Sequence, residues 1–320
     1  VASRGDHDVA HAHLTAHGLA EYFCALEIGW GAKSEAVRRI ASTLNIGLDT
    51  VAFVDNDALE RAEVAAALPQ VRTYPAHLLD ELAGLAEFRP AVVTHDARAR
   101  RRMYQAERAR TAAEEEFAGT PTEFLRGLGL VMTVRRAGEA DIARAHELTV
   151  RTHQLNTTGV TYDERDLREL TRSPRHEVLV ASLEDRYGQY GTIGLAVTEL
   201  DATRAVLDLL LMSCRVMSRR VGSVLLDHVI RRALDRGLRP HARFVPRDVN
   251  RVMLVTLRFA GFAPVEEPED QAGHGGHDGR ILLARDPALP PPPPPGHVRL
   301  ITEEPEPTVA GAENETGASS

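Results

Sequence analysis

The sequence predicts an α/β protein with two compact parts, a mainly parallel sheet followed by an α+β domain. Short apolar strands alternate with amphipathic helices over residues 1–90, which is typical of a parallel sheet. Strands that read as antiparallel neighbours follow one another over residues 177–213. The length of 320 residues and the hydrophobic content of 43% provide material for two cores.

Composition excludes several classes of function. The net charge is −8 and no long basic block occurs, which argues against nucleic acid as a partner. No apolar run approaches the roughly 18 residues of a membrane span. The two cysteines, Cys24 and Cys214, and the lack of a signal peptide favour a reducing cytoplasm.

The first part, residues 1–90, begins with Val1-Ala2-Ser3, which resembles the last residues of a strand. Because a strand usually has about five residues, we expect the chain to begin inside an element. Asp57 to Glu60 fits a capping box that starts a helix. The remaining predicted strands are 25–28, 51–54 and 71–74, and the predicted helices are 6–17, 34–44, 57–68 and 76–85.

The rest of the chain divides into three segments. Residues 91–129 form a strongly charged helical connector, and residues 130–286 form the α+β domain. Residues 287–320 begin with a proline run followed by Glu, Thr, Gly and Ser, and this composition predicts a disordered tail. Within the α+β domain the predicted strands are 131–135, 177–182, 192–200, 205–213, 239–245 and 279–284, and the helices are 139–151, 221–236 and 250–259.

Three polar residues of the first part are expected to meet at one edge of its sheet. Ser3 and Asp55 end predicted strands, and Lys33 begins a helix after Gly29-Trp30-Gly31. Lys33 is also the single lysine among 38 Lys and Arg residues. Ligands of open α/β sheets bind at the carboxyl ends of the strands. A hydroxyl, an ammonium and a carboxylate there suit phosphate chemistry, and the carboxylate suits Mg²⁺. Helix capping and a solvated surface lysine are the structural alternatives.

Several motifs occur in order along about residues 1–265. They are the segments 29–35 (Gly-Trp-Gly-Ala-Lys-Ser-Glu), 44–49, 53–61, 151–158 (Arg-Thr-His-Gln-Leu-Asn-Thr-Thr) and 211–216 (Leu-Met-Ser-Cys-Arg-Val). Together they resemble the FkbH-like proteins, members of the haloacid dehalogenase superfamily from polyketide pathways. The fold that it implies is a partial haloacid-dehalogenase-like parallel sheet followed by a GNAT-like domain.

This resemblance implies a phosphatase and glyceryl transferase. Such a protein takes 1,3-bisphosphoglycerate, a small phosphorylated three-carbon substrate, and loads the glyceryl group onto an acyl carrier protein. Ser3 would bind phosphate, Lys33 would stabilise charge, and Asp55 would lie beside Mg²⁺. The second acid that the superfamily often has after Asp55 is Asn56 here, and Asp57, which also fits a helix cap, is the candidate to replace it as a ligand. The superfamily's Asp-x-Asp nucleophile precedes the hydroxyl motif, so we expect this chain to be truncated before Val1.

Residues 130–286 resemble the GNAT acyltransferase fold, in which an Arg/Gln-x-x-Gly-x-Gly/Ala loop binds the CoA pyrophosphate. The matching residues are Arg219, Arg220, Gly222 and Ser223, and Asn250 begins the fold's later helix. Val224 replaces the small residue of the motif, which makes CoA a weaker prediction than the phosphopantetheine of a carrier protein. An ordinary strand-to-helix turn is the structural alternative.

Cys214 is the candidate nucleophile of this second domain. It ends a predicted strand beside Arg215, Arg219 and Arg220, and positive charge lowers the pKa of a thiol. We therefore hypothesise that it holds the glyceryl group as a thioester. Unpaired cysteine is also among the most buried residue types, so a core role stays open.

Three functions remain from the sequence. The first is loading of a glyceryl unit onto an acyl carrier protein for polyketide biosynthesis. The second is a non-catalytic module that binds a carrier protein, which the missing nucleophile favours. The third is a CoA-dependent N-acyltransferase, which Val224 disfavours.

Overall fold

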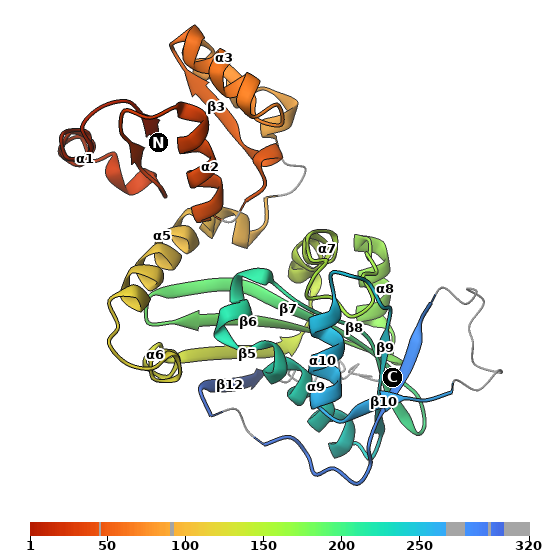
Figure 1. Ribbon diagram of the computed structural model, residues 1–320. Helices are drawn as coiled ribbons and strands as arrows, with labels where there is room; N and C mark the ends of the chain where they lie inside the picture. The colour runs from red at the N-terminus through yellow and green to blue at the C-terminus, as the bar shows by residue number, and fades with distance from the viewer. Residues whose placement is uncertain (45, 90–92, 267–278, 294–295, 304–320) are drawn as a thin grey trace, which may run out of the picture. The chain divides into compact units, whose positions relative to one another are not determined.

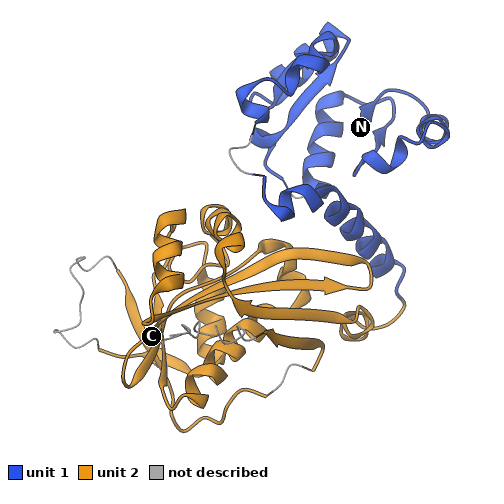
Figure 2. Cartoon of the chain, turned by 180° about the vertical axis from the view of Figure 1, so that it is seen from behind, with its two compact units in different colours: residues 1–117 blue, residues 118–320 orange. Residues whose placement is uncertain are grey.

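The structure is a computed structural model that describes residues 1–44, 46–89, 93–266, 279–293 and 296–303 (Figure 1). The chain divides into two compact units, residues 1–117 and 118–320 (Figure 2). The division falls inside the stretch 91–129 that the sequence predicts as a connector. Residues 304–320 of the predicted tail lie outside the described residues.

Unit 1 contains two pairs of parallel strands, but they form two separate two-stranded sheets instead of the single parallel sheet that the sequence predicts. β1 (Ala2–Ser3) pairs with β2 (Glu27–Ile28), and β3 (Ala52–Asp55) pairs with β4 (Arg72–Pro75). The helices are α1 (His7–Ala16), α2 (Lys33–Leu44), α3 (Ala58–Ala67), α4 (Leu79–Leu82) and α5 (His95–Glu115). The core consists of Val37, Phe53, Val64, Leu68 and Val71. The haloacid-dehalogenase-like assignment of this unit stays a prediction.

Helix α5 belongs to unit 1, although its charge predicts a solvated connector. Met103, Ala106 and Arg110 are buried on one side of the helix. The side chain of Gln105 donates a hydrogen bond to the carbonyl of Glu21 over 2.5 Å. The spacing of these buried residues places them on one face of the helix. The high overall charge of the segment does not indicate this buried face.

Unit 2 is a mixed sheet of eight strands with the order β10-β11-β9-β8-β7-β6-β5-β12. Strands β8 and β9 are parallel, as are β5 and β12, and the other neighbours are antiparallel. The strands are β5 (Leu130–Arg136), β6 (His176–Asp185), β7 (Gly188–Leu200), β8 (Arg204–Met212), β9 (Arg239–Phe244), β10 (Phe262–Pro264), β11 (Ile281–Arg285) and β12 (Val298–Glu303). The helices are α6 (Pro121–Gly127), α7 (Ile142–Arg151), α8 (Glu164–Arg172), α9 (Gly222–Asp235) and α10 (Arg251–Phe259).

Helices cover both faces of this sheet (Figure 1). Leu195 and Val197 of β7 belong to the core under α7 and α8. A Cβ added at Gly194 would lie 2.9 Å from the side chain of Leu225 in α9. Because successive residues of a strand point to opposite faces, α9 lies across the sheet from α7 and α8. Gly194 therefore permits a close approach of α9 to β7.

Glu177 of β6 ties the last turn of α9 to the sheet. Its carboxylate is buried and accepts hydrogen bonds from Arg136, Arg232 and Arg236 over 2.8–3.1 Å. Burial alone would raise the pKa of Glu177, but Arg232 and Arg236 outweigh it and lower the pKa to about 2. The carboxylate therefore stays ionised at neutral pH and holds three guanidinium groups at one point.

The chain after β11 is ordered over residues 286–293 and 296–303, and the prediction of disorder from residue 287 is wrong there. Residues 286–293, named the strap here, lie along α9. Arg285 donates to the carbonyl of Leu289 over 3.1 Å, and Arg231 of α9 donates to that of Pro292 over 3.3 Å. β12 then pairs with the edge of β5 from Val298–Leu130 onward. A proline residue has no backbone N–H donor, but its carbonyl can still accept a hydrogen bond. The composition of the tail does not show that arginine side chains elsewhere in unit 2 donate to these carbonyls.

Within the described ranges, none of the helices combines the length and the apolar character that a membrane crossing needs.

Candidate functional site

Lys33 and Asp55 come together in unit 1, as the strand-end argument predicts. The ammonium of Lys33 lies 3.0 Å from the carboxylate of Asp55 and 2.8 Å from the carbonyl of Ala2, and Lys33 is buried. The other carboxylate oxygen of Asp55 accepts the backbone N–H of Asp57 over 2.9 Å. Burial works against ionisation of Asp55, but the N–H of Asp57 and the ammonium of Lys33 together lower its pKa. The pair is therefore a fixed, charged contact between the ends of β1 and β3.

The other predicted residues of this site do not complete a magnesium centre. The Ser3 hydroxyl is placed 3.3 Å from the carbonyl of Arg4. Asp57 accepts the N–H of Leu59 over 2.8 Å and so caps α3. Both oxygens of Asp55 are already bonded, and the described residues contain no group of three or more His, Cys, Asp or Glu side chains that could hold a metal. The donor set present does not fit Mg²⁺.

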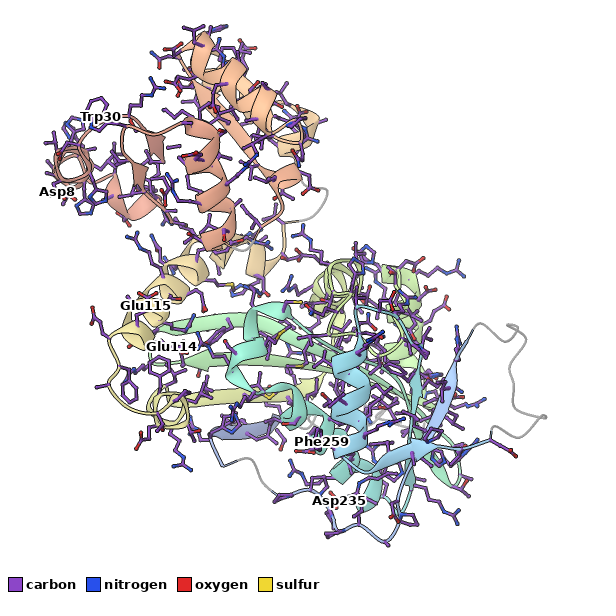
Figure 3. All side chains as sticks on the ribbon, in the orientation of Figure 1. Asp8, Trp30, Glu114, Glu115, Asp235 and Phe259 are labelled. Atoms are coloured by element: carbon purple, nitrogen blue, oxygen red, sulfur yellow. The ribbon has the colours of Figure 1, made fainter. Side chains whose placement is uncertain are left out.

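The turn before α2 carries the single tryptophan of the chain. Trp30 is 79% exposed and projects from unit 1 (Figure 3). The Gly29-Trp30-Gly31 motif therefore presents a large aromatic surface while it positions Lys33 at the start of the helix.

Cys214 lies directly after β8, at the start of the short 3-10 helix Cys214–Arg219. The thiol is half-buried, and burial raises its pKa, whereas the backbone N–H groups of Cys214 itself and of Leu155 lower it to a smaller extent. No neighbouring arginine contributes to this shift. The expected lowering of the pKa by Arg215, Arg219 and Arg220 is therefore not found, because adjacency in sequence did not bring their charges to the sulfur.

The predicted pyrophosphate loop adopts a tight turn into α9. Arg219 is buried and Arg220 has a left-handed backbone with φ of 54°. Gly222 begins α9, and no side chain caps the helix at its N-cap residue, Val221. Val224 is buried in the core, so its replacement of a small residue follows from packing. The side chain of Arg219 is buried and so does not face solvent at this turn.

Ser223 lines a groove of about 510 Å³ between α9 and α10. The strap forms one wall of this groove, from Leu289 to Pro293. Phe259 at the end of α10 lines it as well and is 89% exposed (Figure 3). The groove that the GNAT resemblance would assign to CoA is thus bordered by the protein's own tail.

Strands β8 and β9 pair only from Arg204–Arg239 to Leu207–Ala242 and then diverge. Residues 155–157, named the fork segment here, lie between the diverging strands. The N–H of Thr157 donates to Leu210 over 3.0 Å, and Met212 donates to Leu155 over 2.9 Å. On the other side Val245 donates to Thr157 over 3.0 Å. The fork segment therefore occupies the backbone edge of β8 beyond the point where β8 and β9 diverge.

Asn250 holds this segment and does not face a cofactor. It is fully buried, and its amide nitrogen lies 3.0 Å from the carbonyls of Asn156 and Val245 and 3.4 Å from that of Thr157. Its amide oxygen accepts the N–H of Arg247 over 3.0 Å. The prediction that Asn250 binds a cofactor is therefore wrong for this arrangement, because its hydrogen-bonding groups are used by backbone.

Two further polar features of unit 2 have no predicted role. The fork segment belongs to the motif 151–158 that resembles the FkbH-like proteins. Asp208 is the extra residue of a bulge in β8, where Leu207 and Leu209 pair with consecutive residues of β7. Burial raises the pKa of Asp208 to about 6, although Arg243 opposes this shift. A lone aspartate within the apolar run Val-Leu-Asp-Leu-Leu was the available signal.

Comparison with known proteins gives likenesses for about half of the chain. No protein-family model matches it, and no curated protein matches it. Among solved structures, the chain is similar to the ribosomal-protein-S18-alanine N-acetyltransferase of Escherichia coli, with 17% identity and a TM-score of 0.37 over 48% of this chain and 93% of that one. It is similar also to a GNAT-family acetyltransferase of Staphylococcus aureus, with 12% identity and a TM-score of 0.38 over 48% and 98%.

A third similar structure is a chimera of the spermidine N-acetyltransferase of Vibrio cholerae, with 13% identity and a TM-score of 0.36 over 48% of this chain and 93% of that one. All three likenesses concern a GNAT-like sheet over about half of the chain. They leave the reaction, the substrate and the identity of unit 1 open.

Proposed function

We propose that unit 2 is an acyl-transfer domain in which the Cys214 thiol carries the acyl group as a thioester. The observation that carries this proposal is the position of the half-buried free thiol of Cys214, which lies directly after β8 and leads into the turn before Gly222 that resembles the GNAT pyrophosphate loop.

The reaction exchanges one acyl bond for another. The thiolate of Cys214 attacks the carbonyl carbon of the donor, a carbon–sulfur bond forms, and the donor's bond to its leaving group breaks. The leaving group departs with the electron pair, and the thiol proton passes to solvent. A second thiol then takes the acyl group from Cys214 and restores it. Because burial raises the pKa of Cys214, the rate of acylation should increase with pH.

The finer identity of the acyl group rests on the resemblance to FkbH-like proteins. It supports a glyceryl group from 1,3-bisphosphoglycerate as the donor and the phosphopantetheine of an acyl carrier protein as the acceptor. The buried contact of Lys33 with Asp55 agrees with that resemblance, since these are two of the residues that it names.

Acetyl-CoA is the alternative donor. The GNAT-like arrangement of unit 2 is compatible with an acetyltransferase. The fork segment between β8 and β9 opposes the pantetheine arm of CoA and that of a carrier protein equally, so it does not discriminate between the two donors. If unit 2 only binds a carrier protein, neither donor would acylate Cys214.

The test is the intact mass of the whole chain after incubation with 1,3-bisphosphoglycerate or with acetyl-CoA. We expect one phosphoglyceryl adduct with the first donor, because attack on the acyl phosphate releases one phosphate and leaves the other on the acyl group. This adduct should be absent in Cys214→Ser and kept in Cys24→Ser. Cys24 is a matched control because it is the other free cysteine and burial raises its pKa too. If only acetyl-CoA gives an adduct on Cys214, the proposal of acyl transfer stands, but the donor is acetyl-CoA and not 1,3-bisphosphoglycerate. No adduct with either donor would refute the proposal.

A further inference from the structure

Strand β12 forms one end of the sheet of unit 2. Among the strands that the structure describes, it pairs with β5 on one side and has no neighbour on the other. An edge strand presents a row of backbone N–H and C=O groups to which a further strand can pair. Proteins often block such an edge with proline, lysine or a β-bulge. Val298–Glu303 contains neither proline nor lysine, and its register with β5 is unbroken, so this edge is suited to pairing.

The side chains of β12 divide between two faces of the sheet. Leu300 lies opposite the buried Met132 of β5 and therefore shares the buried face of that strand. Successive residues of a strand point to opposite faces, so Arg299, Ile301 and Glu303 lie together on the other face. All three are exposed. The outward face of the edge strand thus reads basic, apolar, acidic.

This order of side chains is complementary to itself. A second copy of β12 that runs antiparallel, with Ile301 opposite Ile301, brings Arg299 of each copy opposite Glu303 of the other. Opposite charges that face each other across two strands stabilise the pairing. On the buried face, the same register places Leu300 opposite Thr302. A two-fold axis repeats each of these contacts, so two ion pairs flank one apolar pair.

Other arrangements of the same two strands are less favourable. A parallel, in-register pair would put Arg299 opposite Arg299 and Glu303 opposite Glu303, and like charges directly opposite each other are destabilising. An antiparallel pair shifted by two residues would put Ile301 opposite a charged side chain. The charges of β12 therefore favour one antiparallel register, which closes after two copies.

We propose that β12 is the interface of a two-fold dimer of this chain, in which the two strands pair antiparallel about Ile301. Glu303 also lies opposite Arg135 of β5, so in the dimer it stands between two guanidinium groups. Residues 299–303 alone bury less surface than a typical stable interface, and we expect a dimer whose population depends on protein concentration. This dimer is independent of the acyl transfer, because β12 contributes no residue to the site of Cys214.

The test is sedimentation velocity of the whole chain at low ionic strength over a wide range of concentrations. We expect a species of twice the monomer mass that increases with concentration. In Arg299→Glu, and equally in Glu303→Arg, the two-fold axis turns two attractive pairs into two repulsive ones. Each variant should therefore raise the dissociation constant by roughly tenfold or more.

A mixture of the two variants provides the decisive experiment. One copy then carries two acidic side chains at these positions and the other carries two basic ones, so both pairs in the mixed dimer are attractive. We expect equal amounts of Arg299→Glu and Glu303→Arg to dimerise with a dissociation constant within about threefold of that of the wild type. Neither variant alone should do so.

Arg165→Glu is the matched control. The Arg165 side chain lies on α8, is 84% exposed and gives the same change of net charge, so this variant should dimerise like the wild type. Truncation before β12 cannot serve as a control, because it would uncover the edge of β5. Ile301→Cys, combined with Cys24→Ser and Cys214→Ser, should be joined into a dimer by a short bismaleimide. Arg165→Cys in the same background should not.

The remaining outcomes would overturn the inference. They are a monomer at every concentration, a dimer that both charge reversals leave intact, and a dimer that both reversals remove and the mixture does not restore. Far-UV circular dichroism of each variant reports whether it is folded. If Glu303→Arg fails to fold beside Arg135, the bismaleimide experiment decides alone: a dimer joined at residue 301 supports the interface, and its absence refutes it.

Discussion

Replacement of Glu177 by glutamine should remove a large, pH-dependent part of the stability of unit 2. The pKa of Glu177 is about 2 in the folded protein, against an ordinary value of 4.5. The difference of about 2.5 pKa units, at about 1.4 kcal/mol per unit, corresponds to about 3 kcal/mol of stabilisation. Because the pKa is lowered on folding, this stabilisation is fully present above pH 4.5 and is lost as the pH falls through about 2.

The assay is denaturant unfolding followed by far-UV circular dichroism at several pH values between 7 and 2.5. We expect Glu177→Gln to lower the free energy of unfolding by about 3 kcal/mol at pH 7, and the difference from wild type to shrink steadily below pH 4.5. Glu184→Gln is the matched control, since Glu184 lies on the same strand and is exposed. A difference between wild type and Glu177→Gln that stays constant down to pH 2.5 would refute the reasoning.

Three further predictions follow from the structure. Lys33→Met should leave the carboxylate of Asp55 without its ammonium partner and so raise the pKa of Asp55. We expect it to lower the free energy of unfolding of unit 1 by about 3 kcal/mol, as measured by urea unfolding at pH 7. An unchanged stability would contradict this. Asp208 has a raised pKa of about 6, so its contribution to stability is lost as the pH rises from about 4 through 6; Asp208→Asn should flatten that dependence, and an identical pH profile of the melting temperature would argue against it. Removal of residues 296–320 should expose the outer edge of β5 and promote self-association, visible as a larger species in size-exclusion chromatography, and a monodisperse product of monomer size would count against it.

Local sequence patterns predicted most of the elements of unit 2. The apolar run ending in Met212 and the amphipathic stretch from Val221 gave β8 and α9 to within one residue. Helix α8 was not predicted, although Asp163 and Asp166 form a capping box at its start. The capping box is a local sequence signal for the start of this helix, but the helix is short and strongly charged and so lacks a clear apolar pattern.

The candidate sites were predictable where topology alone brings residues together. Lys33 begins α2 and Asp55 ends β3, and the two meet although β1 and β3 belong to separate two-stranded sheets. The role of Asn250 could not be predicted in this way, since its partners lie in a loop 94 positions earlier and become neighbours only when β8 and β9 diverge. The pKa of Cys214 was wrong in direction because a count of adjacent arginines ignores burial and the directions of their side chains.

The pairing of β12 with β5 also sets an order of events during synthesis. Leu130 opens the first strand of unit 2, and its partner Val298 is made 168 positions later. At roughly 5–20 residues per second, about 10–30 s separate the two strands on the ribosome. During that interval the outer edge of β5 has no partner from its own sheet. During synthesis the outer edge of β5 is therefore open to pairing with other proteins. This period ends when β12 has been made and pairs with β5.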